Sequence, residues 1–221
     1  MTKREIQRRL RDLERTIIDG VSGMDLDDTI GSVKVWFDDE HNANFTGWAR
    51  FSDDRRLRYR LARALTPRCA GLLEIAWSLD VKRVVFLMVN PSTANAFKPD
   101  NTITKCCQFA TQWGADVLEV VNLFALRSTD PKGLDEPGID RGDGPDNDEQ
   151  IIEACTGATR VIAAWGNNGW RGGRGLIVRG MLARRGIQLE HFGMTREGYP
   201  LHPLARGKAF IPLTREPVLW T

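Results

Sequence analysis

The sequence predicts an α/β protein: three layers, α/β/α, with a mainly parallel central sheet, plus an N-terminal helix and hairpin. Short apolar runs at 84–89, 117–126, 160–164 and 187–192 have the length of strands buried on both faces, as in a parallel sheet. Segments with helical spacing of apolar residues separate these runs. Strands that alternate with helices are typical of a parallel sheet covered by helices on its two faces.

Length and composition predict one domain with an extension. At 221 residues the chain exceeds the usual ~150 per domain, so we assign 45–221 to the α/β domain and 1–44 to an N-terminal helical extension and linker. Hydrophobic content of 42% and charged content of 27% are ordinary for a globular protein. No apolar run approaches the ~20 residues of a membrane span, and the first residues are charged rather than signal-like. We therefore expect no membrane segment, and the lack of CxxC pairing among the four cysteines indicates a reducing cytoplasm.

The first third of the chain carries the extension and the hairpin. Residues 3–18 space Ile6, Leu10, Leu13 and Ile17 by three and four, which predicts a charged helix with a narrow apolar stripe. That stripe packs on the core or on a partner, so the helix is a candidate for self-association. Residues 20–31 read as a linker. Alternating residues at 32–37 and 45–52 predict a hairpin, and 57–65 continues as a strand or a short helix.

Three helices are predicted after the central strand. The first is capped by Asp100 or Asn101, and Gly114 ends it. The second runs from Asp146 to about Cys155, and the third spans 175–185. The first helix would bury Cys106 and Cys107, so these vicinal cysteines indicate core packing rather than redox chemistry. The four cysteines form no CxxC pair, and the three histidines lie far apart, so we expect no metal site.

Charge is strongly segregated along the chain although the net charge is only +2. Residues 55–68 hold six arginines and no acid, and 168–189 hold five arginines and no acid. Residues 135–153 hold eight acids against one arginine. A solvated face is the common explanation for one such run. Two arginine-only runs indicate a phosphate-bearing partner.

Polar residues follow each predicted strand at its carboxyl end, where open α/β sheets bind their ligands. They are Asn90, Pro91 and Ser92 after the first strand, Asn122 with Arg127, Ser128 and Thr129 after the second, Gly166 and Asn167 after the third, and His202 and Pro203 after the fourth. Simpler readings stay open for each of them. The first group can cap a turn, Asn122 can satisfy neighbouring backbone, and His202 can be an ordinary surface residue.

Four motifs carry a resemblance to a known family. NPSTA at 90–94, NLFALRSTDP at 122–131, AWG at 164–166 and GYPLHPL at 198–204 occur in the order found in a bacterial and phage family known only as domain of unknown function 1643. The resemblance covers roughly residues 45–212. That family name implies no activity.

Three of these segments also resemble, more distantly, the uracil-DNA glycosylase superfamily, in its mismatch-specific thymine and uracil branch. VVFLMVNPSTANA is similar to a motif whose asparagine, matching Asn90, positions the attacking water. The second segment is similar to one whose asparagine, matching Asn122, contributes to the base pocket. His202-Pro203 resembles the start of the last motif, whose loop enters the minor groove. The chain departs from the superfamily at Leu204, where serine is usual, and by extra residues before Arg127 and Pro131.

The resemblance and the chemistry agree. Because the amide of Asn90 cannot act as a strong base, a site built on it needs a bond that breaks largely unaided, as an N-glycosidic bond does through a sugar cation and a base anion. Donors from backbone N–H groups, Asn122 or His202 would stabilise that anion, with no metal or cofactor. Phe97 is a candidate to stack on an extruded base. The expected catalytic residues are Asn90 and His202; the expected substrate contacts are Pro91, Ser92, Phe97, Asn122, Arg127, Thr129, Gly166 and Asn167; the expected DNA contacts are Arg171, Arg174, Pro203, Leu204 and Arg206.

The leading hypothesis is therefore a DNA glycosylase-like enzyme with a uracil-DNA-glycosylase-like fold. It would release a nucleobase, modified or not, by water attack and leave an abasic site in DNA. One alternative is an enzyme that hydrolyses or transfers the base of a free nucleotide. The other is a non-catalytic module that recognises modified nucleic acid.

Overall fold

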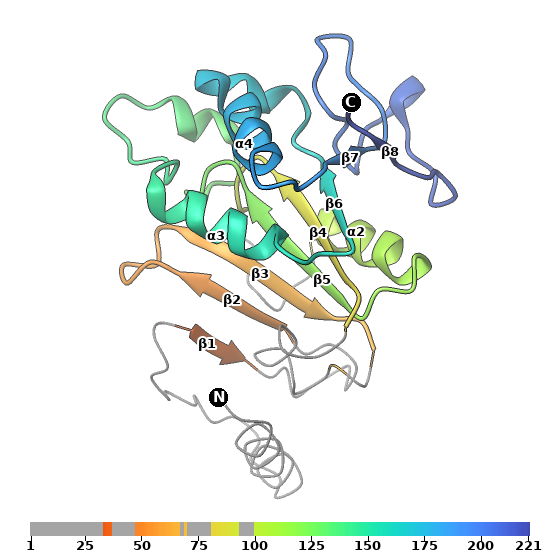
Figure 1. Ribbon diagram of the computed structural model, residues 1–221. Helices are drawn as coiled ribbons and strands as arrows, with labels where there is room; N and C mark the ends of the chain where they lie inside the picture. The colour runs from red at the N-terminus through yellow and green to blue at the C-terminus, as the bar shows by residue number, and fades with distance from the viewer. Residues whose placement is uncertain (1–32, 37–46, 67–68, 70–80, 93–99) are drawn as a thin grey trace, which may run out of the picture.

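The computed structural model describes residues 33–36, 47–66, 69, 81–92 and 100–221 (Figure 1). The predicted helix at 3–18, the linker at 20–31 and Phe97 lie outside them. The described residues form an eight-stranded sheet in the order β1-β2-β3-β5-β4-β6-β7-β8. The strands are β1 (Val33–Trp36), β2 (Gly47–Phe51), β3 (Arg58–Ala64), β4 (Arg83–Met88), β5 (Val117–Asn122), β6 (Arg160–Ala163), β7 (Glu190–His191) and β8 (Val218–Leu219).

The α/β class is confirmed, but the sheet is mixed where a mainly parallel one was predicted. Only β5, β4, β6 and β7 are mutually parallel. The predicted hairpin of β1 and β2 continues into β3, and all three strands join the sheet through antiparallel ladders, as does β8 at the other end. The short connection from β2 to β3 produces an antiparallel pair. The antiparallel ladders of β3 with β5 and of β7 with β8 join strands that are distant in the chain, so a short connection does not account for them. The hairpin thereby extends the β5 edge of the parallel core.

Two of the predicted strands are shorter than their apolar runs. β5 ends at Asn122, and the residues after it continue as a buried loop in which Leu126 forms an isolated bridge with Leu57. The run at 187–192 contributes only Glu190 and His191 to the sheet. Apolar side chains there are buried without a ladder, so burial alone overstates the strand length. The open choice for 57–65 is settled as a strand, since β3 pairs on both sides.

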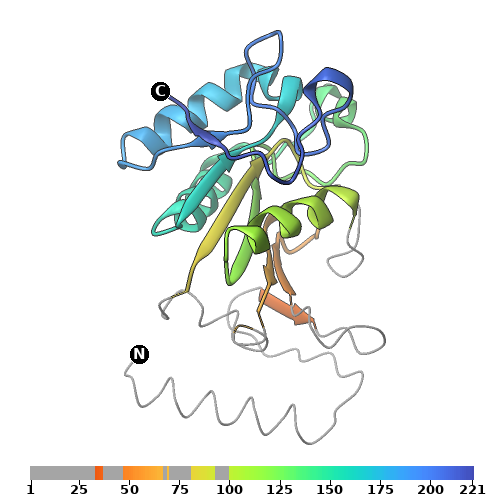
Figure 2. The same ribbon diagram turned by 90° about the vertical axis from the view of Figure 1, so that its right-hand side faces the viewer.

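Helices cover both faces of the sheet. Figure 2 shows the sheet nearly edge-on, with α2 (Asn101–Gln112) on one side and α3 (Pro145–Cys155) and α4 (Arg174–Ala183) on the other. Short 3-10 segments η1 (Pro131–Asp135), η2 (Gly166–Gly173) and η3 (Gly207–Ala209) occupy the loops. Along β4, Val84 and Phe86 belong to the core under α2, while Val85 and Leu87 belong to the core under α3 and α4. The period of two places successive side chains on opposite faces.

The predicted cap and core of α2 are present. The Asp100 side chain accepts a hydrogen bond from the backbone N–H of Ile103, at 2.7 Å, and so satisfies one of the free donors of the first turn. Cys106 is buried and Cys107 half-buried. Burial raises the pKa of both thiols, that of Cys107 to about 11, so they stay protonated at neutral pH. Core packing is therefore the role that their surroundings support.

A buried ion cluster fixes β3, β5 and β4 against one another. Glu119 in the middle of β5 is fully buried and accepts hydrogen bonds from Arg60 of β3 and Arg83 of β4. Arg83 also donates to the Ala154 carbonyl at the end of α3. Burial raises the pKa of Glu119, and the two arginines oppose that shift. The two arginines thus pair with one carboxylate on the α3 side of the sheet.

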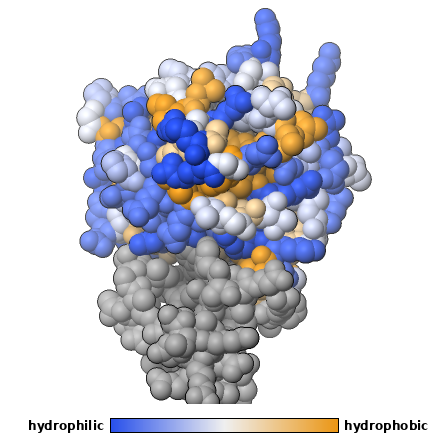
Figure 3. Space-filling view, viewed as in Figure 1, coloured by the Kyte–Doolittle hydropathy of each residue, from blue (hydrophilic) through white to orange (hydrophobic). Residues whose placement is uncertain are grey.

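The surface carries both apolar and polar side chains. Figure 3 shows apolar surface on the upper part of this view. Leu176 and Ile177 of α4 are among the exposed apolar residues. Among the described residues, none of the helices combines the length and the apolar character that crossing a bilayer requires.

Candidate functional site

The candidate site lies at the carboxyl ends of β4 and β6. β4 is followed by β5 on one side and, after α3, by β6 on its other side, so the strand order reverses at the β4–β6 pair. Open α/β sheets bind ligands at such a reversal. Leu87 of β4 pairs with Ala163 of β6. Asn90 and Gly166 each follow three residues after that pair, on neighbouring strands.

The side-chain amide of Asn90 is fixed in one orientation. Its Nδ2 donates to the carbonyl oxygens of Pro91, at 3.1 Å, and Ser128, at 2.8 Å. Both amide hydrogens are thereby used, which identifies the nitrogen side of the group. No described residue donates to its Oδ1. Asn90 is thus a half-buried acceptor whose direction the backbone sets.

Hydrogen bonds connect this turn to the loop after β5 and to α2. The backbone N–H of Ser128 donates to the Pro91 carbonyl, at 2.9 Å. The Ser92 hydroxyl lies 3.1 Å from Oδ2 of Asp100, the residue that caps α2. Pro91 is buried and Ser92 half-buried. The predicted contacts Pro91 and Ser92 therefore hold the Asn90 turn in place.

His202 lies beside Gly166. A Cβ added to Gly166 would sit 3.6 Å from Cβ of His202, and the backbone N–H of Gly166 donates to the carbonyl of Pro200, at 2.8 Å. The φ of Gly166 is +61°, a left-handed conformation that favours glycine. These contacts bring the His202 segment onto the end of β6, next to the end of β4.

The protonation state of His202 follows from its contacts. Its Nδ1 accepts a hydrogen bond from the backbone N–H of Leu204, at 3.1 Å, which places the proton of the neutral ring on Nε2. Burial lowers the pKa of His202 below its ordinary value of 6.5, and the Asp100 carboxylate raises it by less. No described residue accepts a hydrogen bond from Nε2. At neutral pH His202 is therefore an uncharged donor to which the described residues offer no acceptor.

Asn122 ends β5 opposite Met88 of β4, and its side chain is only 1% exposed. Its Nδ2 is buried and has no hydrogen-bond partner among the described residues. The simpler reading was that this side chain bonds to nearby backbone, but its nitrogen donates to no backbone carbonyl of the described residues. Its own backbone carbonyl accepts from the buried Asn147 side chain of α3, at 3.1 Å. A buried donor without a partner is costly unless a ligand supplies the acceptor.

Other predicted contacts lie further out. Asn167 is exposed and donates to Glu197, at 2.9 Å, and Thr129 is exposed. Arg127 is half-buried, lies over the Phe51 ring and donates to the Arg55 carbonyl, at 3.1 Å. Burial lowers the pKa of Arg127, and Arg55 nearby lowers it further. Arg127 thus belongs to a basic surface at the start of β3.

Two of the predicted DNA contacts are engaged inside the protein. Arg171 and Arg174 are each 5% exposed. Arg171 forms a two-pronged ion pair with Asp135 of η1, at 2.8 and 2.9 Å. Arg174 donates to the Leu123 carbonyl and pairs with Asp148 of α3. Their assignment to DNA phosphates gains no support from these positions, because both guanidinium groups already have internal acceptors.

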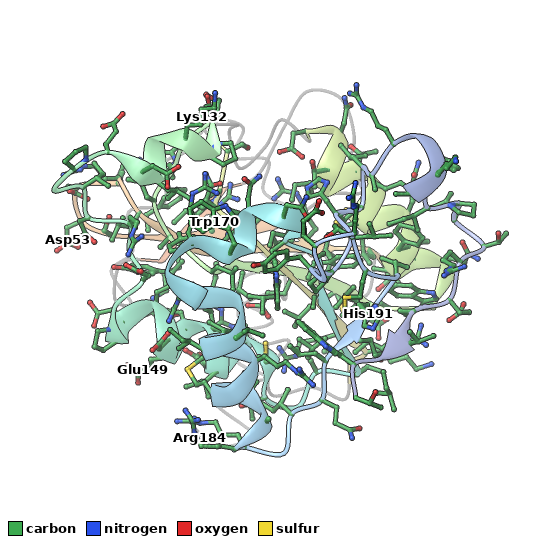
Figure 4. All side chains as sticks on the ribbon, turned by 90° about the horizontal axis from the view of Figure 1, so that it is seen from above. Asp53, Lys132, Glu149, Trp170, Arg184 and His191 are labelled. Atoms are coloured by element: carbon green, nitrogen blue, oxygen red, sulfur yellow. The ribbon has the colours of Figure 1, made fainter. Side chains whose placement is uncertain are left out.

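The glycines around Arg171 have a packing role. A Cβ at Gly169 would overlap the indole of Trp165, and one at Gly175 would sit 3.0 Å from its Nε1. The glycine-rich turn therefore lets η2 and α4 close over Trp165. Trp170 in the same turn is 56% exposed, and Figure 4 places it near the middle of the face seen from above.

The remaining predicted DNA contacts follow His202. Pro203 is buried, Leu204 is 38% exposed, and Arg206 is exposed. No set of three His, Cys, Asp or Glu side chains that could hold a metal ion occurs in the described part of the chain.

Two residues near the site were not singled out from the sequence. Asp100 was assigned only as a helix cap, yet its carboxylate also acts on the pKa of His202. Arg58 was counted only within the basic run 55–68. It is buried at the start of β3, and its Nε has no partner among the described residues. Only the arginine run itself could have drawn attention to it.

Comparison with known proteins gives a family and no activity. A family model described as a protein of unknown function, DUF1643, matches residues 71–204. No curated protein and no solved structure matches the chain significantly.

Proposed function

The chain belongs to the DUF1643 family, and we propose that it cleaves the N-glycosidic bond of a nucleobase in DNA by water attack, leaving an abasic site. A uracil-DNA-glycosylase-like arrangement of the four parallel strands is part of the same proposal. Asn90, Asn122 and His202 carry the three motifs on which that likeness rests, and each follows or ends an element at one edge of the sheet.

The observation that supports the proposal is that Asn90 offers a hydrogen-bond acceptor and His202 a donor. Asn90 keeps an acceptor, Oδ1, and His202 keeps a donor, Nε2–H, while their other polar atoms are held by backbone. An acceptor of this kind orients a water molecule without removing its proton in advance. A donor of this kind stabilises negative charge as it develops on a departing group.

The reaction assigns a role to each group. The C1′–N bond breaks and its electron pair leaves with the base, so the sugar becomes cationic and the base anionic. Nε2–H of His202 and Nδ2 of Asn122 donate to the base anion. Water held by Oδ1 of Asn90 adds to C1′, and its proton passes to solvent or to the departing base. Because the bond breaks before the water adds, a weak acceptor is sufficient at this position.

Nucleic acid as the source of the base is supported by the exposed residues around the site. Trp170 is exposed in η2, the segment that begins at Gly166, and aromatic side chains stack on bases (Figure 4). Leu204 and Arg206 follow His202 on an exposed loop. Arg171 and Arg174 are left out of this interface because of their internal ion pairs.

The test is base release from a panel of duplex and single-stranded oligonucleotides that carry modified bases, followed by alkaline cleavage at abasic sites. Wild-type protein should cut at least one member of the panel, and Asn90→Ala should not. The matched control is Asn167→Ala, since Asn167 is an exposed asparagine bonded to Glu197 and should be dispensable. Tight binding to an oligonucleotide without any base release would instead favour the non-catalytic recognition module. Release from free nucleotides only would favour the nucleotide enzyme.

A further inference from the structure

Arg58 occupies an unusual position for a buried charge. It is the first residue of β3, which runs antiparallel to β5, so β3 begins where β5 ends. The backbone N–H of Arg58 donates to the carbonyl of Ala125, at 2.8 Å, three residues after Asn122. The Arg58 side chain is 5% exposed. Because β3 is antiparallel to β5, its first residue, the buried Arg58, lies at the carboxyl end of the parallel strands, where the candidate site is.

The guanidinium of Arg58 has no acceptor within the described residues. Its Nε is enclosed without a hydrogen-bond partner, and no ion pair or side-chain hydrogen bond involves its other nitrogens. Arg60 and Arg171, which are buried to a similar degree, are both paired with carboxylates. Burying an unpaired charge costs free energy, so an arginine with a purely structural role is expected to be paired as these two are.

The groups around Arg58 leave an excess of donors. Burial, together with smaller effects of the neighbouring Arg127 and Arg63, lowers the pKa of its guanidinium to about 10, and the Asp100 carboxylate opposes this shift. The group therefore stays protonated at neutral pH. Asp100 is shared, because it also accepts from Ser92 and from the Ile103 N–H and acts on the pKa of His202. Nδ2 of Asn122 and Nε of Arg127 are further buried donors that have no hydrogen-bond partner among the described residues.

We propose that Arg58 anchors a phosphate-binding subsite beside Asn90 and His202, which receives a phosphate group of the nucleotide whose base is released. This inference rests on the proposed function for the identity of the ligand. A phosphate is compact and acceptor-rich, and the planar guanidinium fork matches its oxygens. Arg127, half-buried next to Arg58, adds positive charge on the outer side. The phosphate belongs either to a free nucleotide or to a DNA strand.

The first measurement is binding of inorganic phosphate and of deoxynucleoside 5′-monophosphates by isothermal titration calorimetry. Arg58→Gln removes the charge, and we expect about tenfold to hundredfold weaker binding, the range for loss of one hydrogen bond to a charged group. The matched control is Arg56→Gln, which removes the same charge from an exposed arginine two residues away and should bind as wild type. Equal affinity of Arg58→Gln and wild type, or no phosphate binding by wild type, would overturn the proposal.

Thermal unfolding gives a readout that does not depend on activity. Because the buried charge of Arg58 has no acceptor among the described residues, Arg58→Met should unfold at the same or a higher temperature than wild type in phosphate-free buffer. Added phosphate should raise the Tm of wild type but not of Arg58→Met, since a ligand stabilises only the protein that binds it. A large loss of Tm for Arg58→Met in phosphate-free buffer would assign Arg58 to the core and refute the subsite.

Oligonucleotides separate the two sources of phosphate. A defect of Arg58→Gln confined to 5′-monophosphates assigns the subsite to free nucleotides, and a defect confined to oligonucleotides without terminal phosphates assigns it to DNA phosphodiesters. Base release is measured on the same proteins. Arg58-dependent phosphate binding without base release would leave the subsite standing and refute the glycosylase, whereas base release and binding that are indifferent to Arg58 would do the reverse.

Discussion

Nδ2 of Asn90 lies 2.8 Å from the carbonyl oxygen of Ser128, and this bond ties the end of β4 to the loop that follows β5. The side chain most important to the proposed reaction is therefore also a connection between two strands. It donates with its nitrogen to the protein and keeps its oxygen for a ligand. Substitutions at this position consequently change both the geometry of the edge and its chemistry.

Asn90→Asp is expected to destabilise the fold in a pH-dependent way. A carboxylate cannot donate to the carbonyls of Pro91 and Ser128, so its charged form is disfavoured in the folded state, and the folded pKa should rise above the unfolded value of about 3.9. The stability deficit should then be smallest in acid and should grow as the pH rises through the folded pKa, to about 1–3 kcal/mol at neutral pH. Urea unfolding from pH 4 to 8 measures it, with exposed Asn167→Asp as the control. A deficit that is the same at every pH would contradict this view of the amide.

His202 should stay neutral through physiological pH. Burial lowers its pKa below 6.5, so the unfolded chain takes up a proton first as the pH falls, and the contribution of His202 to stability is lost below about 6.5. A histidine-selective NMR titration should give a pKa of His202 below 6.5.

His202→Ala should slow single-turnover base release about a hundredfold to a thousandfold, as removal of one positioned donor does. His191→Gln is the control, because His191 has a similar backbone contact at Nδ1 but lies in β7.

Reversing Arg171 is expected to weaken folding rather than DNA binding alone. Arg171→Glu places a carboxylate against Asp135 and should cost about 1–3 kcal/mol in urea unfolding. Asp135→Arg in the same chain should recover part of that loss, because the ion pair is restored in the opposite sense. Exposed Arg184→Glu should stay within about 0.5 kcal/mol of wild type. Lack of any recovery in the double variant would mean that the ion pair does not hold η1 to η2.

Glu119→Ala should be the most damaging of these changes to stability. It leaves Arg60 and Arg83 buried without their shared carboxylate, and breaking a buried pair in this way costs about 3–5 kcal/mol. Chemical denaturation followed by far-UV circular dichroism measures it. Because the cluster lies on the α3 side of the sheet, base release per folded molecule should be unchanged. A variant as stable as wild type would show that the cluster contributes little net free energy.

Local sequence patterns predicted the helices and strands better than they predicted which strands pair and in which direction. β4 was recognisable because a run of apolar residues bounded by Asn90-Pro91 is a signal contained in a few neighbours. The direction in which β3 meets β5 depends on contacts between residues 59 positions apart, such as Arg60 and Glu119, and no local pattern encodes it. The mixed character of the sheet was missed for that reason.

The sequence predicted which residues belong to the candidate site, but not how their side chains are oriented or paired. Asparagine after a buried strand pointed to Asn90, yet the orientation of its amide is set by Ser128, 38 residues further on. Arg171 appeared free in an arginine-only stretch because its partner Asp135 is 36 residues away. Arg58 was missed for a similar reason. Its importance comes from a buried Nε that has no hydrogen-bond partner among the described residues, and the sequence does not show this.

The boundary of the family match separates the proposed reaction residues from the proposed phosphate contact. Asn90, Asn122 and His202 all lie within residues 71–204, whereas the strand that carries Arg58 ends at Ala64, before the match begins. Bond breaking would then depend on the ends of the parallel strands, and recognition of the phosphate on β3, which joins the sheet through an antiparallel ladder. The two parts of the proposed site therefore have different origins in the topology of the sheet.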